Sequence, residues 1–198
     1  MRVARRKYRL RLLDGGPARH YDLQLRLGNA AQSFSYIAND GNLLPAPLTR
    51  NSVRLAPAER ADIVVDFSRY ALGTELFLVN RLNQLDGRKP EKDFLATPLQ
   101  LMKIIVEREP RERDVSQVPA VLRELPPIDT AQAVRTRRFD FGRDNGMWTI
   151  NLRLFNNLPI ASPVKGTAEI WVLRNLSGGW SHPVHIHFEE GRILTRNG

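Results

Sequence analysis

The chain has 198 residues, of which 42% are hydrophobic, and contains 13 glycines, 13 prolines and no cysteine, so it is long enough to bury a core and cannot form a disulfide. No run approaches the roughly 18 consecutive apolar residues of a membrane-spanning helix, and we expect no membrane partner. The net charge of +9 raises nucleic-acid binding as a class, but the basic residues are spread along the chain without a stacking-aromatic motif, so we expect a solvated basic surface and no nucleic-acid partner.

Alternation of apolar with charged or polar residues predicts half-buried strands through the first hundred residues. Turn residues separate these segments, as at 14–17 and 39–42. Many short strands with Gly and Pro turns, and no long amphipathic helix, predict a β-sandwich. The predicted strands are 7–12, 21–27, 34–38, 53–55, 61–67, 74–79 and 99–106. The basic N-terminus passes directly into the first of them, without the apolar core or cleavage site of a signal peptide.

The composition changes between Glu107 and Arg135, where charged residues and prolines are dense. Such a sequence cannot extend a central strand, so we expect a surface linker with room for one short helix. Further strands are predicted at 136–141, 148–152 and 168–173.

The predicted organisation is a first domain at 1–108, a linker at 109–135 and a second domain at 136–198. A complete sandwich needs about 100 residues, so we expect the second domain to be partial. Open strand edges and an uncovered apolar face would make it prone to aggregation or disorder unless it docks on the first domain.

Three of the four histidines lie close together, at His182, His185 and His187. Neutral imidazole is the commonest protein ligand for copper and zinc. On a strand, alternation sends His185 and His187 to one face, while His182, placed before Pro183, can point elsewhere. The pattern predicts two neighbouring metal centres that share one strand, which is unusual for a simple three-histidine zinc site.

The sequence offers few further ligands for such centres. His20 is the one other histidine, there is no cysteine, and the three methionines lie far from the cluster in sequence. Soft-ligand copper chemistry is therefore incomplete, and a closed zinc site would need a fourth ligand from Glu189, Glu190 or His20. We expect this sequence to be part of a metal protein.

The sequence resembles a known family along nearly its whole length. Residues 6–12, 36–45 and 55–67 resemble the second cupredoxin domain of three-domain multicopper oxidases, in particular the branch of spore-coat laccases and bilirubin oxidases. Residues 166–171 and the His-Pro-Val-His-Ile-His motif at 182–187 resemble the start of that family's third domain. The resemblance implies an all-β fold, a cupredoxin-like Greek-key β-sandwich followed by a truncated second cupredoxin-like sandwich.

The resemblance also implies copper as the cofactor. His182 would bind the type 1 copper, which takes electrons from the reducing substrate. His185 would bind the type 2 copper, and His187 one of the type 3 coppers of the cluster where O2 is reduced to water. A short segment between the two centres would fix their separation. The implied substrates are phenolic, pyrrolic or metal-ion compounds.

Some features of the family have no counterpart in this sequence. Its first domain, with two His-x-His motifs, is absent, as are the later His-Cys-His motif and axial methionine. The resemblance therefore implies that the missing first domain and the remainder of the third domain are partners of this chain, and that the chain alone is inactive. The alternative is a non-catalytic cupredoxin-like module that serves as a structural spacer or in interactions.

Other residues receive structural interpretations. We expect His20 to lie in an exposed loop, and Glu59 and Arg60 to form a structural ion pair. We expect one of Glu189 and Glu190 to point to solvent and the other to lie under the strand's edge, rather than to supply protons to a metal cluster. The three tryptophans are expected to pack in cores and turns, and the glycine pair at 178–179 to be a plain loop.

Overall fold

The computed structural model describes residues 1–186 and 190–197, and it confirms the predicted all-β class. The chain divides into two compact units, each considered by itself below: a first unit, Met1–Glu124 with Pro183–Gly198, and a second unit, Leu125–His182. Within the part of the chain that is described, no helix has the length and apolar character required to cross a membrane.

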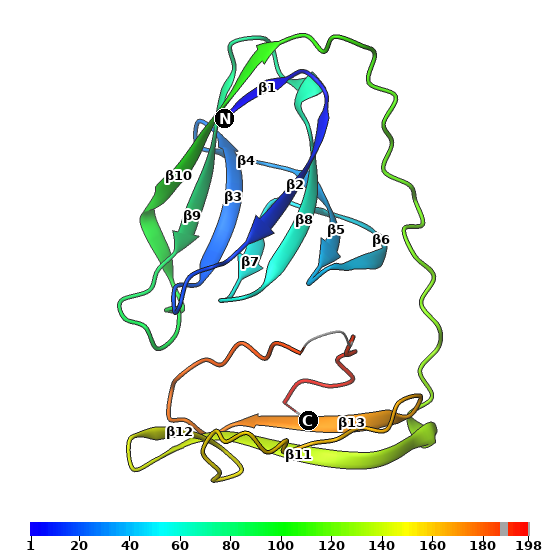
Figure 1. Ribbon diagram of the computed structural model, residues 1–198. Coiled ribbons are helices and arrows are strands. Elements are labelled where there is room, and N and C mark those ends of the chain that lie inside the picture. The colour runs from blue at the N-terminus through cyan, green and yellow to red at the C-terminus, as the bar shows by residue number, and fades with distance from the viewer. Residues whose placement is uncertain (187–189, 198) are drawn as a thin grey trace. The chain divides into compact units, whose positions relative to one another are not determined.

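Two sheets make up the first unit (Figure 1). The larger has six strands in the order β1-β10-β9-β3-β4, with β7 paired to β3, and the smaller has four in the order β2-β8-β5-β6. The six strands are β1 (Arg2–Ala4), β3 (Tyr21–Leu27), β4 (Ala30–Gln32), β7 (Val53–Leu55), β9 (Glu75–Leu82) and β10 (Phe94–Arg108). The four strands are β2 (Lys7–Leu13), β5 (Phe34–Asn39), β6 (Asn42–Arg50) and β8 (Arg60–Asp66). A 3-10 turn, η1 (Phe67–Arg69), follows β8.

The core of the first unit lies between these sheets and follows from the predicted alternation. Along β8, Ala61, Ile63 and Val65 are buried, whereas the residues between them are partly exposed. Phe67 is fully buried, and its ring packs edge-on against Tyr8 at 5.6 Å between ring centroids. Because every second side chain of a strand lies on the same face of its sheet, the apolar faces of the two sheets pack against each other and form the core of the sandwich.

The hairpin between β5 and β6 confirms the predicted turn at 39–42. Asn39 pairs with Asn42, and the two residues between them have positive φ, 48° at Asp40 and 88° at Gly41. These angles match the two-residue turns whose twist suits a β-hairpin. Glycine is needed at position 41 because an L side chain is strained at that φ.

A single three-stranded sheet, in the order β12-β11-β13, forms the second unit. Its strands are β11 (Ala133–Asp144), β12 (Met147–Ile150) and β13 (Ala168–Asn175), preceded by the 3-10 turn η2 (Thr130–Gln132). The antiparallel β11–β12 hairpin pairs Phe141 with Ile150 and Arg143 with Trp148, and β13 pairs with β11 in parallel. The strand that was predicted to start at residue 136 therefore begins earlier, at Ala133.

The strand predicted through the histidine segment is wrong for the described residues. After β13 ends at Asn175, residues 176–186 and 190–197 contain no strand. Pro183 has no N–H to donate, and a strand forms only where a neighbouring backbone completes its hydrogen-bond ladder. Alternation therefore does not set the directions of His182 and His185, and His187 lies outside the described residues.

Candidate metal centre

His182 occupies an aromatic niche built within the second unit. The Phe141 ring stacks on the imidazole, with 5.7 Å between centroids and 26° between planes, and Trp148 meets it edge-on at 5.2 Å. Burial lowers the pKa of His182 from its usual value of 6.5, because a charged imidazolium loses hydration in such surroundings. The ring is therefore neutral at neutral pH, the form that binds metals.

The loop that follows β13 supplies polar contacts to this niche. His182 Nε2 lies 2.8 Å from the hydroxyl oxygen of Ser177, which is itself buried. Ser177 in turn donates its hydroxyl to Asn175 Oδ1 at 2.6 Å. Neither Ser177 nor Asn175 was singled out from the sequence. The signal that could have found them is the turn sequence Asn-Leu-Ser-Gly-Gly-Trp at 175–180, just before the histidine motif.

His185, which belongs to the first unit, contacts an arginine. Arg60 Nη1 lies 3.2 Å from His185 Nδ1, and a guanidinium can only donate, so Nδ1 of this ring acts as an acceptor. The same guanidinium pairs with Asp40 at 3.2 Å. In this arrangement Nδ1 of His185 is engaged by a cation and is not presented to a metal.

The predicted Glu59–Arg60 ion pair is wrong. Arg60 pairs with Asp40, and Glu59 Oε2 instead accepts the N–H of Ala56 at 2.7 Å. The physical reason is local. In the turn before β8 the backbone N–H of Ala56 lies only three residues from Glu59, within reach of its carboxylate. Glu59 thereby closes its own turn.

The described residues do not assemble the predicted histidines into one centre. Over 1–186 and 190–197, no group of three or more histidine and acidic side chains has an arrangement that could hold a metal ion. His187 and Glu189 fall outside these ranges. Within these ranges, the imidazole of His182 is hydrogen-bonded to Ser177, and the imidazole of His185 is hydrogen-bonded to Arg60.

Two further sequence expectations are corrected by the contacts. His20 is buried rather than exposed: it lies directly before β3, and its backbone N–H donates to Gln84 Oε1 at 2.9 Å. Glu190 does not lie on a strand, and both its carboxylate oxygens accept from Arg123, at 2.8 and 2.5 Å. The pKa of Glu190 is lowered by these hydrogen bonds, so it is an ionised structural partner.

The three tryptophans make ring contacts within the second unit, but none of them is buried in a core, because Trp148 is 45% exposed and the other two are partly exposed. Trp171 lies 4.9 Å from Phe139, and Trp148 lies edge-on to Trp180 at 5.0 Å. The Arg143 guanidinium stands 5.1 Å above the Trp148 ring and 5.7 Å from Trp180. Of these rings, Trp148 also contacts His182.

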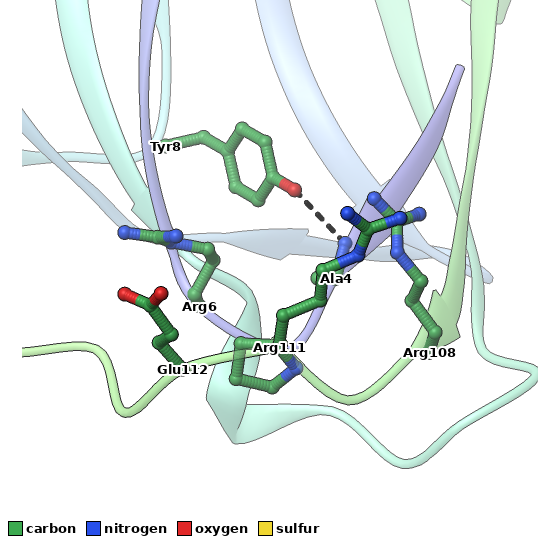
Figure 2. A pocket seen from close by; sticks show the side chains of 7 residues that line it. Ala4, Arg6, Tyr8, Arg108, Arg111 and Glu112 are labelled. Atoms are coloured by element: carbon green, nitrogen blue, oxygen red, sulfur yellow. Dashed lines mark hydrogen bonds between the residues drawn. The ribbon is translucent and has the colours of Figure 1, made fainter.

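Figure 2 shows a different feature, a polar surface hollow of 440 Å³ in the first unit. Arg6, Arg108, Arg111 and Glu112 line it, and the Tyr8 hydroxyl accepts the N–H of Ala4 there at 2.9 Å. The side chains of Arg6 and Arg108 are 45% and 57% exposed. Charges this exposed are screened by water, and ion pairs between them contribute little stability.

No family model matches the chain, but individual proteins do. It is 35% identical to the bilirubin oxidase of Albifimbria verrucaria over 98% of this chain and 34% of that protein. It is 32% identical to a laccase of Bacillus subtilis over 99% of this chain and 37% of that protein. The chain thus spans about a third of the length of the curated relatives it matches.

Solved structures show the same relationship. A multicopper oxidase from the hyperthermophile Aquifex aeolicus matches 76% of this chain with a TM-score of 0.64 and 31% identity, over 31% of its own chain. A laccase-like multicopper oxidase from an Ochrobactrum species matches 88% of this chain and 39% of its own, with a TM-score of 0.69 and 22% identity, which shows the shared fold alone. The cupredoxin-like architecture predicted from the sequence is confirmed.

Proposed function

Because this chain belongs to the multicopper oxidase family, we propose that it supplies copper ligands to an oxidoreductase that passes electrons from a small reducing substrate to O2, forming water. The observation that carries the proposal is the His182 imidazole, which is held between the Phe141 and Trp148 rings and has its pKa lowered by burial. A neutral imidazole suits copper in both of its common oxidation states.

The residues around His182 fit a copper ligand. The niche is lined by Phe141 and Trp148, whose ring contacts hold the plane of the imidazole. Burial disfavours the imidazolium, so a metal ion does not have to displace a proton at neutral pH. Copper bound there would accept and pass on single electrons. The chain's own residues orient the ligand and keep it deprotonated at one nitrogen.

The proposal extends to which type of copper each histidine binds. We assign His182 to the type 1 copper, His185 to the type 2 copper and His187 to a type 3 copper. His185 must leave Arg60 before its Nδ1 is available, or bind through its other nitrogen. The proposed domains are 1–108, matching the family's second domain, and 136–198, matching the first part of its third.

The remaining ligands are proposed to come from other parts of a complete oxidase. This sequence contains no cysteine, so a thiolate ligand would have to come from elsewhere, as would most histidines of an oxygen-reducing cluster. The proposed partners are a first cupredoxin domain and the rest of the third. The chain alone is expected to be inactive and to show no intense blue colour with copper. The proposed substrates are phenolic, pyrrolic or metal-ion compounds.

The test is segment replacement in a relative. Residues 1–198 would replace the matched 37% of the Bacillus subtilis laccase, and copper content and O2 uptake would be measured. We expect copper binding and O2 uptake in the chimera and a loss of the blue absorption in its His182→Gln variant. His20→Gln serves as the histidine-matched control and should keep the blue band.

A copper titration of the chain itself covers the case in which the chimera does not fold. Added Cu²⁺ should broaden NMR signals around His182 before those around His20, and His182→Gln should abolish that order. Equal broadening at both histidines would contradict the proposal.

One contact favours the second candidate, a non-catalytic module. Arg60 holds His185 Nδ1 at 3.2 Å, which is the behaviour of a structural histidine. If that is its role, Arg60→Met should destabilise the chain, and His185→Gln in the chimera should leave copper content unchanged. A fall in copper content with His185→Gln would rule the module out.

A further inference from the structure

The hydrogen bonds around Ser177 decide which nitrogen of His182 carries a proton. Ser177 has one hydroxyl proton, and its Oγ lies 2.6 Å from Asn175 Oδ1 and 3.4 Å from the carbonyl oxygen of Trp180. Both of these oxygens can only accept. The hydroxyl proton is therefore directed away from His182, whichever of the two it meets.

The orientation of the Asn175 amide is fixed by its other contacts. Its Oδ1 also accepts the backbone N–H of Ser177 at 3.1 Å, and its Nδ2 donates to the carbonyl oxygen of Trp180 at 2.5 Å. A backbone N–H can only donate and a carbonyl can only accept, so the opposite amide orientation would leave two clashes of like groups. Asn175 thus presents an acceptor to the Ser177 hydroxyl.

His182 Nε2, 2.8 Å from Ser177 Oγ, must then be the donor in their contact, because the hydroxyl oxygen has lone pairs to offer and no second proton. The neutral ring carries its proton on Nε2, and Nδ1 keeps its lone pair. We infer that Ser177 and Asn175 are positioning residues, which lock His182 in the Nε2–H tautomer and leave Nδ1 as its metal-binding atom.

The backbone of this loop makes the arrangement possible. Gly178 and Gly179 have φ of 66° and 102°, a region of backbone conformation that residues other than glycine rarely adopt. The turn brings the Trp180 carbonyl back to Asn175 and sets His182 opposite Ser177. The glycine pair therefore shapes the loop that orients the ligand.

The metal-binding clause rests on the proposed function, whereas the tautomer does not. Long-range ¹H–¹⁵N NMR of histidine side chains separates the two tautomers in the full 198-residue chain, at a pH where imidazoles are neutral. His182 should appear as Nε2–H. His20 provides an internal reference of the opposite kind, since its Nδ1 faces the Ala18 carbonyl at 3.3 Å and must donate.

Ser177→Ala removes the acceptor for Nε2–H. We expect the ratio of Nε2–H to Nδ1–H at His182 to fall roughly fivefold, the effect of losing one ordinary hydrogen bond. Ser177→Thr keeps the hydroxyl and should restore the ratio. Asn175→Ala removes the nearer acceptor for that hydroxyl, which can then turn toward Nε2, and should lower the ratio. The His20 signals should be the same in every variant.

The outcomes separate the two proposals. An Nδ1–H tautomer at His182 in the unmodified chain, or an unchanged ratio in folded Ser177→Ala, overturns the positioning role. If Ser177→Ala does not fold, as judged by its amide spectrum, the comparison of Ser177→Thr with Asn175→Ala decides. An Nε2–H tautomer that Cu²⁺ does not perturb would support the positioning role and count against the proposed copper ligation.

Discussion

The first and second units use the same kind of element but are held together differently. In the first unit two sheets bury a core of fully covered side chains, among them Phe67, Leu76 and Ile104. In the second unit one sheet of three strands leaves Val134, Trp148 and other large apolar groups exposed. Burial of apolar area is the main source of folding free energy. The first unit therefore has its own source of stability, whereas the second depends more on specific polar and aromatic contacts.

Those contacts in the second unit are ion pairs between β11 and β13. Arg137 donates two hydrogen bonds to Glu169, at 2.6 and 2.9 Å, and Arg174 donates to Asp140. Trp171 Nε1 adds a third bond to Glu169 at 2.9 Å. Bidentate arginine–carboxylate pairs of this kind fix strand register as well as adding stability.

The largest expected effect tests the core of the first unit. Leu76→Ala removes a side chain that is 0% exposed and should lower the free energy of unfolding by about 2–5 kcal/mol, from lost burial and the cavity left behind. Leu85→Ala, at a position 81% exposed, should change it by less than about 0.5 kcal/mol. Denaturant unfolding followed by amide exchange in β9 measures both. Equal effects would mean that the core is not the source of stability.

A smaller effect, confined to the second unit, is its dependence on pH. The hydrogen bonds from Arg137, and then from Trp171, lower the pKa of Glu169 from 4.5 to about 2. A carboxyl whose pKa is lower in the folded state stabilises that state above its unfolded pKa and loses this contribution as the pH falls. The loss should fall between about pH 4.5 and about pH 2. The pKa of Asp140, lowered by its hydrogen bond with Arg174, acts in the same direction.

Tryptophan fluorescence can follow this change, because all three tryptophans of the chain, Trp148, Trp171 and Trp180, lie in the second unit. We expect Glu169→Gln to weaken the pH dependence of the fluorescence-detected urea midpoint without abolishing it. Glu75→Gln removes an ion pair with Lys103 in the first unit and should leave this curve unchanged. A pH dependence that survives intact in Glu169→Gln would assign it to other groups.

The smallest effect concerns a turn of the first unit. A Cβ at Gly41 has room, with its nearest atom 4.0 Å away, but φ there is +88°. Gly41→Ala should therefore cost about 1 kcal/mol through backbone strain alone. Gly15→Ala is matched in space, with nothing within 4 Å and no such φ, and should be nearly neutral. Thermal unfolding compares the two, and similar melting temperatures would contradict the strain argument.

Much of the first unit could be predicted from sequence because its determinants are local. The alternation at 61–67 and the Asn-Asp-Gly-Asn turn each carry their own physical cause in a few residues. The predictions of an exposed His20 and of a Glu59–Arg60 ion pair are wrong because the hydrogen-bond partners of His20 and Glu59, which are Gln84 and the Ala56 N–H, are set by the packing of loops. A hydrogen-bond partner reached through tertiary structure leaves no periodic signal.

The candidate site was predictable only in part for the same reason. The histidine spacing identifies the ligand types, and the likeness to multicopper oxidases identifies the family. The strand expected through the histidine segment does not form over 182–186, because a strand needs a neighbour, which the described residues do not provide. The role of Ser177 and Asn175 depends on the direction of individual protons, which only the geometry of a folded loop reveals.

The parallel pairing of β1 with β10 has a mechanical consequence. The Ile105 N–H donates to the Met1 carbonyl, and the Arg5 N–H donates to the Arg108 carbonyl, each at 2.9 Å. Because the two strands run the same way, tension applied to the start of β1 and the end of β10 would load these bonds in shear, all at once. When force instead acts across the strands from one end, the hydrogen bonds break one after another, and the strands separate at low force. Stretched from these two points, the first unit should resist extension until the whole β1–β10 seam gives way together.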